Sequence, residues 1–153
     1  MNNLFYENAS VLIIGNEILS GRTIDKNFNY IATKLDEHGI SISESRTVSD
    51  SEEEIINAVN ELRKRFKYVF TTGGIGPTHD DVTAKSIAKA FNVKLEVNNE
   101  AYKILEDYYN NLGTEFNDIR QRMARIPKGA KLIKNQISAA PGFNIENVYV
   151  FAG

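Results

Sequence analysis

The stretch of residues 68–83 constrains the fold most, because it joins an apolar segment to a glycine-rich turn and then to a helix. Aromatic and β-branched residues from Tyr68 to Phe70 favour an extended chain. The glycines that follow permit a sharp turn and leave backbone N–H groups uncovered by Cβ atoms. A helix expected to start near Asp81 would add free N–H groups and the positive end of its dipole. We therefore predict a phosphate or pyrophosphate site formed by Gly73, Gly74, Gly76, Pro77, Thr78 and Thr83.

Two neighbouring carboxylates, Asp80 and Asp81, follow the glycine turn. They would repel a bound phosphate unless a hard cation bridged them, so we predict a divalent metal, Mg²⁺, held by this pair, with Asp81 also catalytic. A simpler interpretation stays open, in which the glycines only close a strand–helix connection and an aspartate only caps the helix. The spacing matches neither Gly-x-Gly-x-x-Gly nor Gly-x-x-x-x-Gly-Lys-Ser/Thr, which disfavours ordinary dinucleotide and P-loop sites.

Polar residues beyond two other predicted strands extend this candidate site. The apolar run of residues 10–15 predicts a buried strand, and Asn16, Glu17, Asp25 and Asn27 follow it at the edge where ligands bind in open α/β sheets. Composition alone favours a solvated loop for this segment. Asp50 follows a second predicted strand, where it is either a turn residue or a carboxylate aimed at the same ligand.

Three segments resemble the molybdopterin-binding domain family, in the form that opens the competence-damage-inducible (CinA) proteins. Residues 72–83 resemble the family signature, and residues 15–27 resemble its first motif. Residues 135–143 resemble its second ligand loop, with Ser138 in place of a glycine. The resemblance implies that Asp50 is an acidic, catalytic residue facing the pocket and that Ala140, Pro141, Gly142 and Phe143 contact the ligand. A Pro-Gly turn, with Phe143 in the core, is the alternative.

The resemblance covers residues 10–153 and implies hydrolysis of the pyrophosphate of ADP-ribose or a related nucleotide. Molybdopterin adenylyl transfer uses similar parts, and a module that binds a pterin or nucleotide without turning it over is a further alternative. Family members usually continue into further helices, so we expect residues 1–153 to be one MoaB/Mog-like domain truncated at its C-terminal end. Molybdopterin is therefore a candidate ligand as well as a nucleotide.

Alternating strand and helix signals predict a three-layer α/β/α fold with a mostly parallel mixed sheet, and the resemblance adds one antiparallel strand. Residues 51–54 predict a capping box for the helix after residues 40–48, which should form a strand. A helix through Phe116 and Met123 should end before Pro127. It carries Arg120, Arg122 and Arg125, which we assign to solvated faces. Further strands are expected at 93–97, 128–134 and 148–153, and further helices at 28–35, 84–91 and 100–113.

The net charge and the amino-acid composition exclude some classes of binding partner. A net charge of −2 gives no basic footprint for nucleic acid, and no apolar run approaches the ~20 residues that cross a bilayer. The absence of cysteine excludes disulfides, and the N-terminus lacks the order of a signal peptide. We therefore expect a cytoplasmic protein with a small-molecule partner, no nucleic-acid or membrane partner, and a homo-oligomeric state, dimer or trimer.

Overall fold

Six strands form the main sheet, in the order β2-β1-β3-β8-β7-β6. The computed structural model describes residues 7–153; the first six residues, which bear on the expected lack of a signal peptide, lie outside the described part. The parallel strands are β1 (Glu7–Ile14), β2 (Ile40–Val48), β3 (Tyr68–Thr72) and β8 (Val148–Phe151). Strand β7 (Gly142–Ile145) is antiparallel to both β8 and β6 (Lys131–Ile133). The predicted mixed sheet with one antiparallel strand is confirmed.

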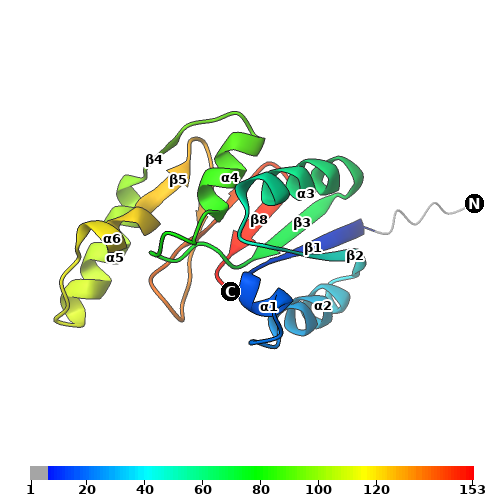
Figure 1. Cartoon of the computed structure of the whole chain (residues 1–153), viewed down its shortest axis with the longest axis horizontal. Coiled ribbons are helices and arrows are strands. Elements are labelled where there is room, and N and C mark those ends of the chain that lie inside the picture. Colours follow the sequence, from blue (N-terminus) through cyan, green and yellow to red (C-terminus); the bar gives the residue numbers. More distant parts are fainter. Residues whose placement is uncertain (1–6) are drawn as a thin grey trace, which may run out of the picture.

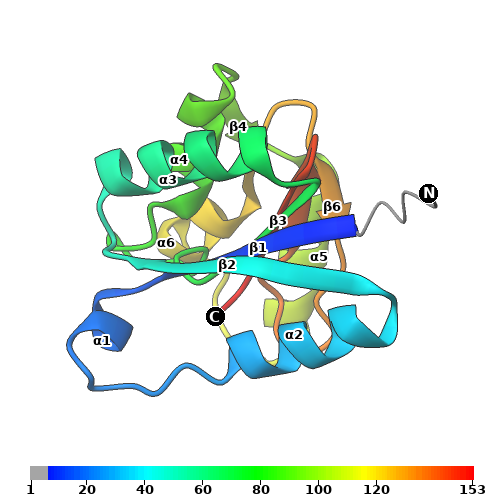
Figure 2. The ribbon, with the colours of Figure 1, turned by 90° about the vertical axis from the view of Figure 1, so that its right-hand side faces the viewer.

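Helices cover both faces of this sheet, as Figure 2 shows. Helices α3 (Glu52–Arg65) and α4 (Thr83–Ala90) lie on one face, and α2 (Asn27–Glu37) lies on the other. The short α1 (Asn16–Leu19) follows β1 directly. Residues 9–14 of β1 are all buried, because the strand is central and covered on both sides. The three-layer prediction is therefore confirmed, and the carboxyl ends of β1, β3 and β8 share one edge.

A second, smaller unit lies beside the main sheet (Figure 1). It contains α5 (Asn99–Asn111), α6 (Asp118–Gln121) and the 3₁₀ turn η1 (Arg122–Ala124). Its strands β4 (Leu95–Val97) and β5 (Arg125–Pro127) pair antiparallel in a separate two-stranded sheet. The strand expected at residues 93–97 therefore exists in shortened form, but its partner is β5 and not the main sheet.

The single helix predicted to run up to Pro127 is wrong. The Asn117 side chain accepts a hydrogen bond from Arg120 N at 3.0 Å and caps a helix that begins only at Asp118. After one turn the chain tightens into η1 and then extends, because β5 pairs with β4 through Leu95 and Pro127. The extended segment still buries Ile126 and Pro127. Apolar spacing alone does not distinguish this arrangement from a longer helix.

The predicted capping box at the start of α3 is also wrong. The Ser51 side chain makes no capping hydrogen bond. The Glu54 carboxylate instead accepts from Ser49 Oγ at 2.9 Å and from Ser49 N at 3.4 Å. Because the chain turns just before the helix, the Ser49 hydroxyl reaches this carboxylate, and Glu54 ties the end of β2 to the first turn of α3.

Candidate functional site

The glycine turn after β3 is held against its neighbours on two sides. Gly73 has φ 96° and its N–H donates to Phe151 O at 3.2 Å, which joins the turn to the end of β8. A Cβ atom on Gly73 would lie 2.1 Å from Ile14 O, and one on Gly74 would lie 2.1 Å from Thr83 Oγ1. Packing therefore requires both glycines, independently of any ligand.

Thr83 connects this turn to α4. Its N–H donates to Gly74 O at 3.0 Å and its hydroxyl donates to Gly73 O at 3.0 Å. The residue is fully buried. The ligand contact predicted for Thr83 stays a prediction. In the structure, the Thr83 hydroxyl stabilises the glycine turn through its hydrogen bond to Gly73 O.

Helix α4 starts at Thr83, two positions later than the expected start near Asp81. Asp81 closes a tight turn instead: its Oδ2 atom accepts from Thr78 N at 2.8 Å and from Thr78 Oγ1 at 2.7 Å, and Asp81 N donates to Thr78 O at 3.2 Å. These local bonds compete with the first helical turn, which explains the later start. The Asp81 carboxylate also lies against Gly76, where a Cβ atom would come within 2.8 Å of Oδ2.

Asp80 and Asp81 have different partners. The Asp80 side chain is 69% exposed and its Oδ1 lies 3.1 Å from His79 Nε2. Asp81 lines two cavities that flank the glycine turn, whereas Asp80 lines neither of them. Of the two carboxylates, only Asp81 therefore lies at the cavities, and the Mg²⁺ ion expected to bridge Asp80 and Asp81 stays a prediction.

The first cavity has a volume of about 440 Å³ and brings together residues from distant parts of the chain. Its acidic side chains are Glu17 and Asp81, and no basic residue is found among the described residues that line it. Tyr108 and Tyr109 of α5 contribute aromatic surface. The remaining walls come from the glycine turn, η1, the loop after β6 and the end of β8, namely Gly73, Gly74, Ile75, Gly76, Pro77, Met123, Ser138, Ala139, Ala140, Ala152 and Gly153.

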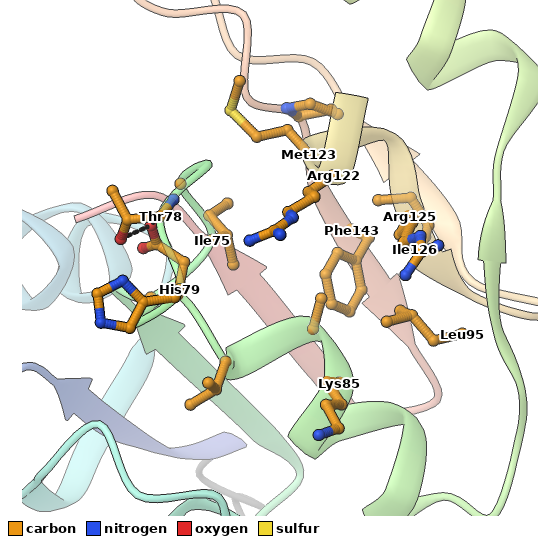
Figure 3. A pocket seen from close by; sticks show the side chains of 16 residues that line it. Ile75, Thr78, His79, Lys85, Leu95, Arg122, Met123, Arg125, Ile126 and Phe143 are labelled. Atoms are coloured by element: carbon orange, nitrogen blue, oxygen red, sulfur yellow. Dashed lines mark hydrogen bonds between the residues drawn. The ribbon is translucent and has the colours of Figure 1, made fainter. Parts of the chain in front are cut away.

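The second cavity, of about 250 Å³, lies on the other side of the same turn. It shares Gly74, Gly76 and Asp81 with the first cavity and adds Thr78, Pro141 and Phe143. Figure 3 shows that basic side chains also reach it, from α4 and from the segment after α6. They are Lys85, Arg122 and Arg125. The sequence interpretation missed both arginines, because a charged side chain on an expected helix carries no signal of the cavity it faces.

Asn16 and Asp50 bind each other instead of lining the first cavity. Asn16 N donates to Asp50 Oδ2 at 2.9 Å, and Asp50 N donates to Asn16 Oδ1 at 3.2 Å. This reciprocal pair ties the loop after β1 to the loop after β2. The neighbouring Glu17 folds its carboxylate back over Gly15, where a Cβ atom would lie 2.6 Å from Oε1. Asp50 therefore binds the residue that precedes the cavity-lining Glu17, and it does not line the cavity itself.

Asp25, Asn27 and Gly142 line neither of the two cavities that Asp81 lines. Asp25 caps α2, because its carboxylate accepts from Asn27 N at 3.3 Å and from Phe28 N at 3.0 Å. Asn27 and Gly142 line a third cavity, of about 670 Å³, between α2 and the sheet. The expectation that Glu17, Asp50, Asp81 and Gly142 surround one cavity is therefore met by Glu17 and Asp81 only.

The loop that carries Ser138 is organised by Asn135. Its side-chain oxygen accepts from Ile137 N at 3.0 Å and from Ser138 N at 3.1 Å, and its Nδ2 donates to Ser138 Oγ at 2.8 Å and Ala140 O at 3.1 Å. Ser138 does not have a positive φ. The loop thus accommodates a serine at position 138, and its hydroxyl accepts a hydrogen bond that a glycine could not.

Lys85, which lines the second cavity, belongs to an ion-pair cluster with Glu52 and Lys89. Hydrogen bonds from Lys89 and Lys85 of α4 lower the pKa of the Glu52 carboxyl at the start of α3. Lys85 Nζ lies 3.1 Å from Glu52 Oε2, and Lys89 binds the other carboxylate oxygen. The Lys85 charge is thus already compensated by a protein carboxylate.

These features define a class: α/β domains that bind small molecules in a crevice beyond the carboxyl ends of parallel strands. A family model described as "Probable molybdopterin binding domain" matches residues 10–153. The chain belongs to this molybdopterin-binding domain family, which confirms the recognition made from the three motifs. No helix formed by residues 7–153 combines the length and apolar character needed to cross a lipid bilayer.

Relatives and solved structures place the chain near the CinA proteins. A protein of Sulfurisphaera tokodaii is 42% identical over 138 residues, covering 90% of this chain and 52% of that protein. A CinA-like protein of Citrifermentans bemidjiense is 40% identical over 135 residues, covering 88% of this chain and 33% of that protein. The chain thus spans about half the length, or less, of these curated relatives.

Two crystal structures extend the comparison. The protein CinA of Thermoplasma acidophilum, itself of unknown function, matches with a TM-score of 0.87 and 32% identity over 96% of this chain and 88% of its own. The tungsten cofactor synthesizing protein MoaB of Pyrococcus furiosus matches with a TM-score of 0.57 and 20% identity, over 95% of this chain and 81% of its own. The second similarity shows the MoaB-like fold alone.

Proposed function

We propose that this domain hydrolyses the pyrophosphate bond of ADP-ribose or a related dinucleotide, assisted by Mg²⁺. The observation that carries the proposal is the convergence of the glycine turn, Glu17, Asp81 and Ala140 on one cavity of about 440 Å³. Such a volume is within the usual range of small-molecule sites. The CinA-like form of the sequence motifs supports the choice of a nucleotide pyrophosphate as substrate.

Backbone amides of the turn are suited to the phosphates. Gly73 N–H is taken by Phe151 O, and Thr78 N–H is taken by Asp81. Within the part of the chain that the structure describes, the amides of residues 74–76 have no hydrogen-bond acceptor. We assign phosphate binding to these three amides, because free N–H groups in a turn attract anions.

The donors at the cavity fit a Mg²⁺ ion that arrives with its substrate. Asp81 Oδ2 is occupied by Thr78, which leaves Oδ1 and the Glu17 carboxylate as acidic donors. Residues 7–153 contain no group of three or more His, Cys, Asp and Glu side chains that could hold a metal by themselves. Mg²⁺ commonly uses one or two carboxylates and completes its shell with water and substrate phosphates. When bound, it would supply charge neutralisation on the phosphates.

The reaction requires water to attack one phosphorus atom in line with the bridging oxygen. A P–O bond to water forms, the P–O bond to the bridging oxygen breaks, and AMP and ribose 5-phosphate are the products of ADP-ribose. Glu17 is the proposed acceptor of the water proton, because its carboxylate lines the cavity. The proposed part of Asp50 is to position Glu17 through its bonds to Asn16.

The first test replaces Asp81 by Asn, which keeps an oxygen acceptor for Thr78 but removes the charge. We expect Mg²⁺-dependent release of AMP from ADP-ribose to fall by about 100-fold or more, while the far-UV circular dichroism stays native. Asp80→Asn is the matched control, because Asp80 lies outside both cavities, and it should keep nearly full activity. Unchanged turnover in Asp81→Asn at saturating Mg²⁺ would refute the role of this carboxylate.

A second candidate function is binding of a pterin or nucleotide without turnover, or with the adenylyl transfer related to it. Two observations favour it. Asp81 Oδ2 already accepts hydrogen bonds from Thr78, which leaves that oxygen less available for catalysis. Tyr108 and Tyr109 also offer aromatic surface on which a planar ring could stack. Tight binding of ADP-ribose by the wild-type domain without AMP release would support it against the hydrolase.

A further inference from the structure

The charge of the lining changes sign across the glycine turn. The 440 Å³ cavity has the acidic residues Glu17 and Asp81, and none of the described residues that line it is basic. The 250 Å³ cavity is lined by Lys85, Arg122 and Arg125 as well as Asp81. Both cavities include Gly74 and Gly76, so they meet at the turn whose free amides we assign to phosphate. The pyrophosphate bridge of ADP-ribose carries two negative charges, and the described residues that line the acidic cavity include no cation to balance them.

Among the three cations, Arg122 differs from Lys85 in having no ion-pair partner among the described residues, and from Arg125 in the direction of its side chain. Lys85 is paired with Glu52 at 3.1 Å. In Figure 3 the Arg122 side chain extends into the cavity in the direction of Ile75, whereas Arg125 turns toward Leu95. Between residues 7 and 153, no carboxylate lies within ion-pair distance of the Arg122 guanidinium. The planar guanidinium can form two parallel hydrogen bonds to phosphate oxygens.

We propose that Arg122 binds a phosphoryl group of the ligand in the 250 Å³ cavity, so that the pyrophosphate crosses the glycine turn with one phosphate at Arg122 and the other at the turn amides. This assignment rests on the proposed function for the identity of the nucleotide. It predicts that ligands with two linked phosphates use Arg122 and that ligands with one phosphate, which the turn amides satisfy, use it little. The remainder of the ligand then occupies the acidic, tyrosine-lined cavity.

The test measures binding by isothermal titration calorimetry with ADP-ribose, ADP, AMP and inorganic pyrophosphate, each with Mg²⁺ and with EDTA. For Arg122→Gln we expect a loss of about tenfold in affinity for ADP-ribose and ADP, and less than about twofold for AMP. The loss should persist in EDTA, because the arginine acts without the metal. Arg122→Lys should recover only part of the affinity, since an ammonium group lacks the planar fork.

Arg125→Gln is the matched control, because it removes the same charge from the same cavity without removing the side chain that points to the turn. An equal loss of affinity in both variants, or wild-type affinity in Arg122→Gln, would overturn the contact between Arg122 and the phosphoryl group. The proposed hydrolase function would still stand in that case if the wild type releases AMP from ADP-ribose. If the wild type binds inorganic pyrophosphate through Arg122 but does not cleave ADP-ribose, this inference stands and the hydrolase proposal falls. Failure of the wild type to bind any of the four probes overturns both.

Discussion

Gly73 combines two separate obstacles to a side chain, an unfavourable backbone angle and a backbone oxygen in the way. Its φ is 96°, and a Cβ atom would lie 2.1 Å from Ile14 O. We expect Gly73→Ala to lower the free energy of unfolding by about 3 kcal/mol or more, because strain and overlap add. Urea denaturation followed by circular dichroism measures this loss.

Gly129→Ala provides the comparison for that substitution. Gly129 has φ 86°, but a Cβ atom there would meet nothing within 4 Å. It should therefore cost only the backbone strain, about 1 kcal/mol. Equal losses in the two variants would show that the contact with Ile14 can relax and that the turn is less tightly held than its geometry indicates.

The site residues that could be predicted from the sequence are those that lie close to one another along the chain. The glycines, Pro77 and Thr78 lie on one continuous stretch and reach the cavities as expected. Asp25 and Thr83 could not be assigned in the same way, because each has a short polar side chain that serves backbone groups nearby. Arg122 could not be found because its position depends on where η1 ends and β5 begins, which no local spacing specifies.

At the scale of elements, α3 and α4 are joined by the pairs of Glu52 with Lys85 and Lys89. The pKa of Glu52 is lowered from 4.5, chiefly by its hydrogen bond to Lys89 and then by that to Lys85. A lowered carboxyl pKa means that the stabilisation is present above pH 4.5 and is lost as the pH falls through the folded-state pKa. The pairs therefore stabilise the packing of the two helices at neutral pH and not in acid.

Glu52→Gln should accordingly lower the free energy of unfolding by about 0.5–1 kcal/mol at pH 7, a modest value because the pair is partly exposed. The difference from wild type should shrink as the pH falls below 4.5 and should be lost below the lowered folded-state pKa, where the carboxyl of the folded wild type becomes protonated. Glu53→Gln, on the exposed side of the same helical turn, is the control and should show a smaller and flatter difference. A wild-type advantage for Glu52 that persists in acid would point to packing instead of charge.

The order and type of most elements followed from hydrophobic spacing. Strand β2 has the bounds 40–48 that alternation predicts, and α2 ends before Gly39, whose φ is 73°. The errors fall where a tertiary contact overrides a local preference. Pro127 should have followed a helix, but its pairing with Leu95 places it in a strand. The strand expected at 128–134 is reduced to β6, because Gly129 with φ 86° forms a turn first.

At the scale of the whole molecule, a ligand that bridges segments far apart in sequence should stabilise the entire domain. Glu17, Gly74 and Ala140 belong to different parts of the chain and line one cavity. At a ligand concentration of 100 times Kd the expected stabilisation is about 2.7 kcal/mol. For a chain of 153 residues this corresponds to a rise in Tm of roughly 5–10 °C.

Differential scanning calorimetry with ADP-ribose and Mg²⁺ measures this shift, and adenosine, which lacks phosphate, is the control. Adenosine should raise Tm by much less, because the turn amides and the metal act on phosphate. An equal shift with adenosine would mean that the base and sugar carry the affinity and that phosphate binding has been assigned to the wrong residues.

The homo-oligomeric state and the cytoplasmic location stay predictions.

Ala152 and Gly153 form part of the wall of the 440 Å³ cavity, and a Cβ atom on Gly153 would lie 3.2 Å from Gly73 Cα. Anything covalently joined after Gly153 therefore starts beside the lining of this cavity. A purification tag placed there would compete with ligands. By the same geometry, an environment-sensitive dye attached just after Gly153 would act as an optical reporter of occupancy.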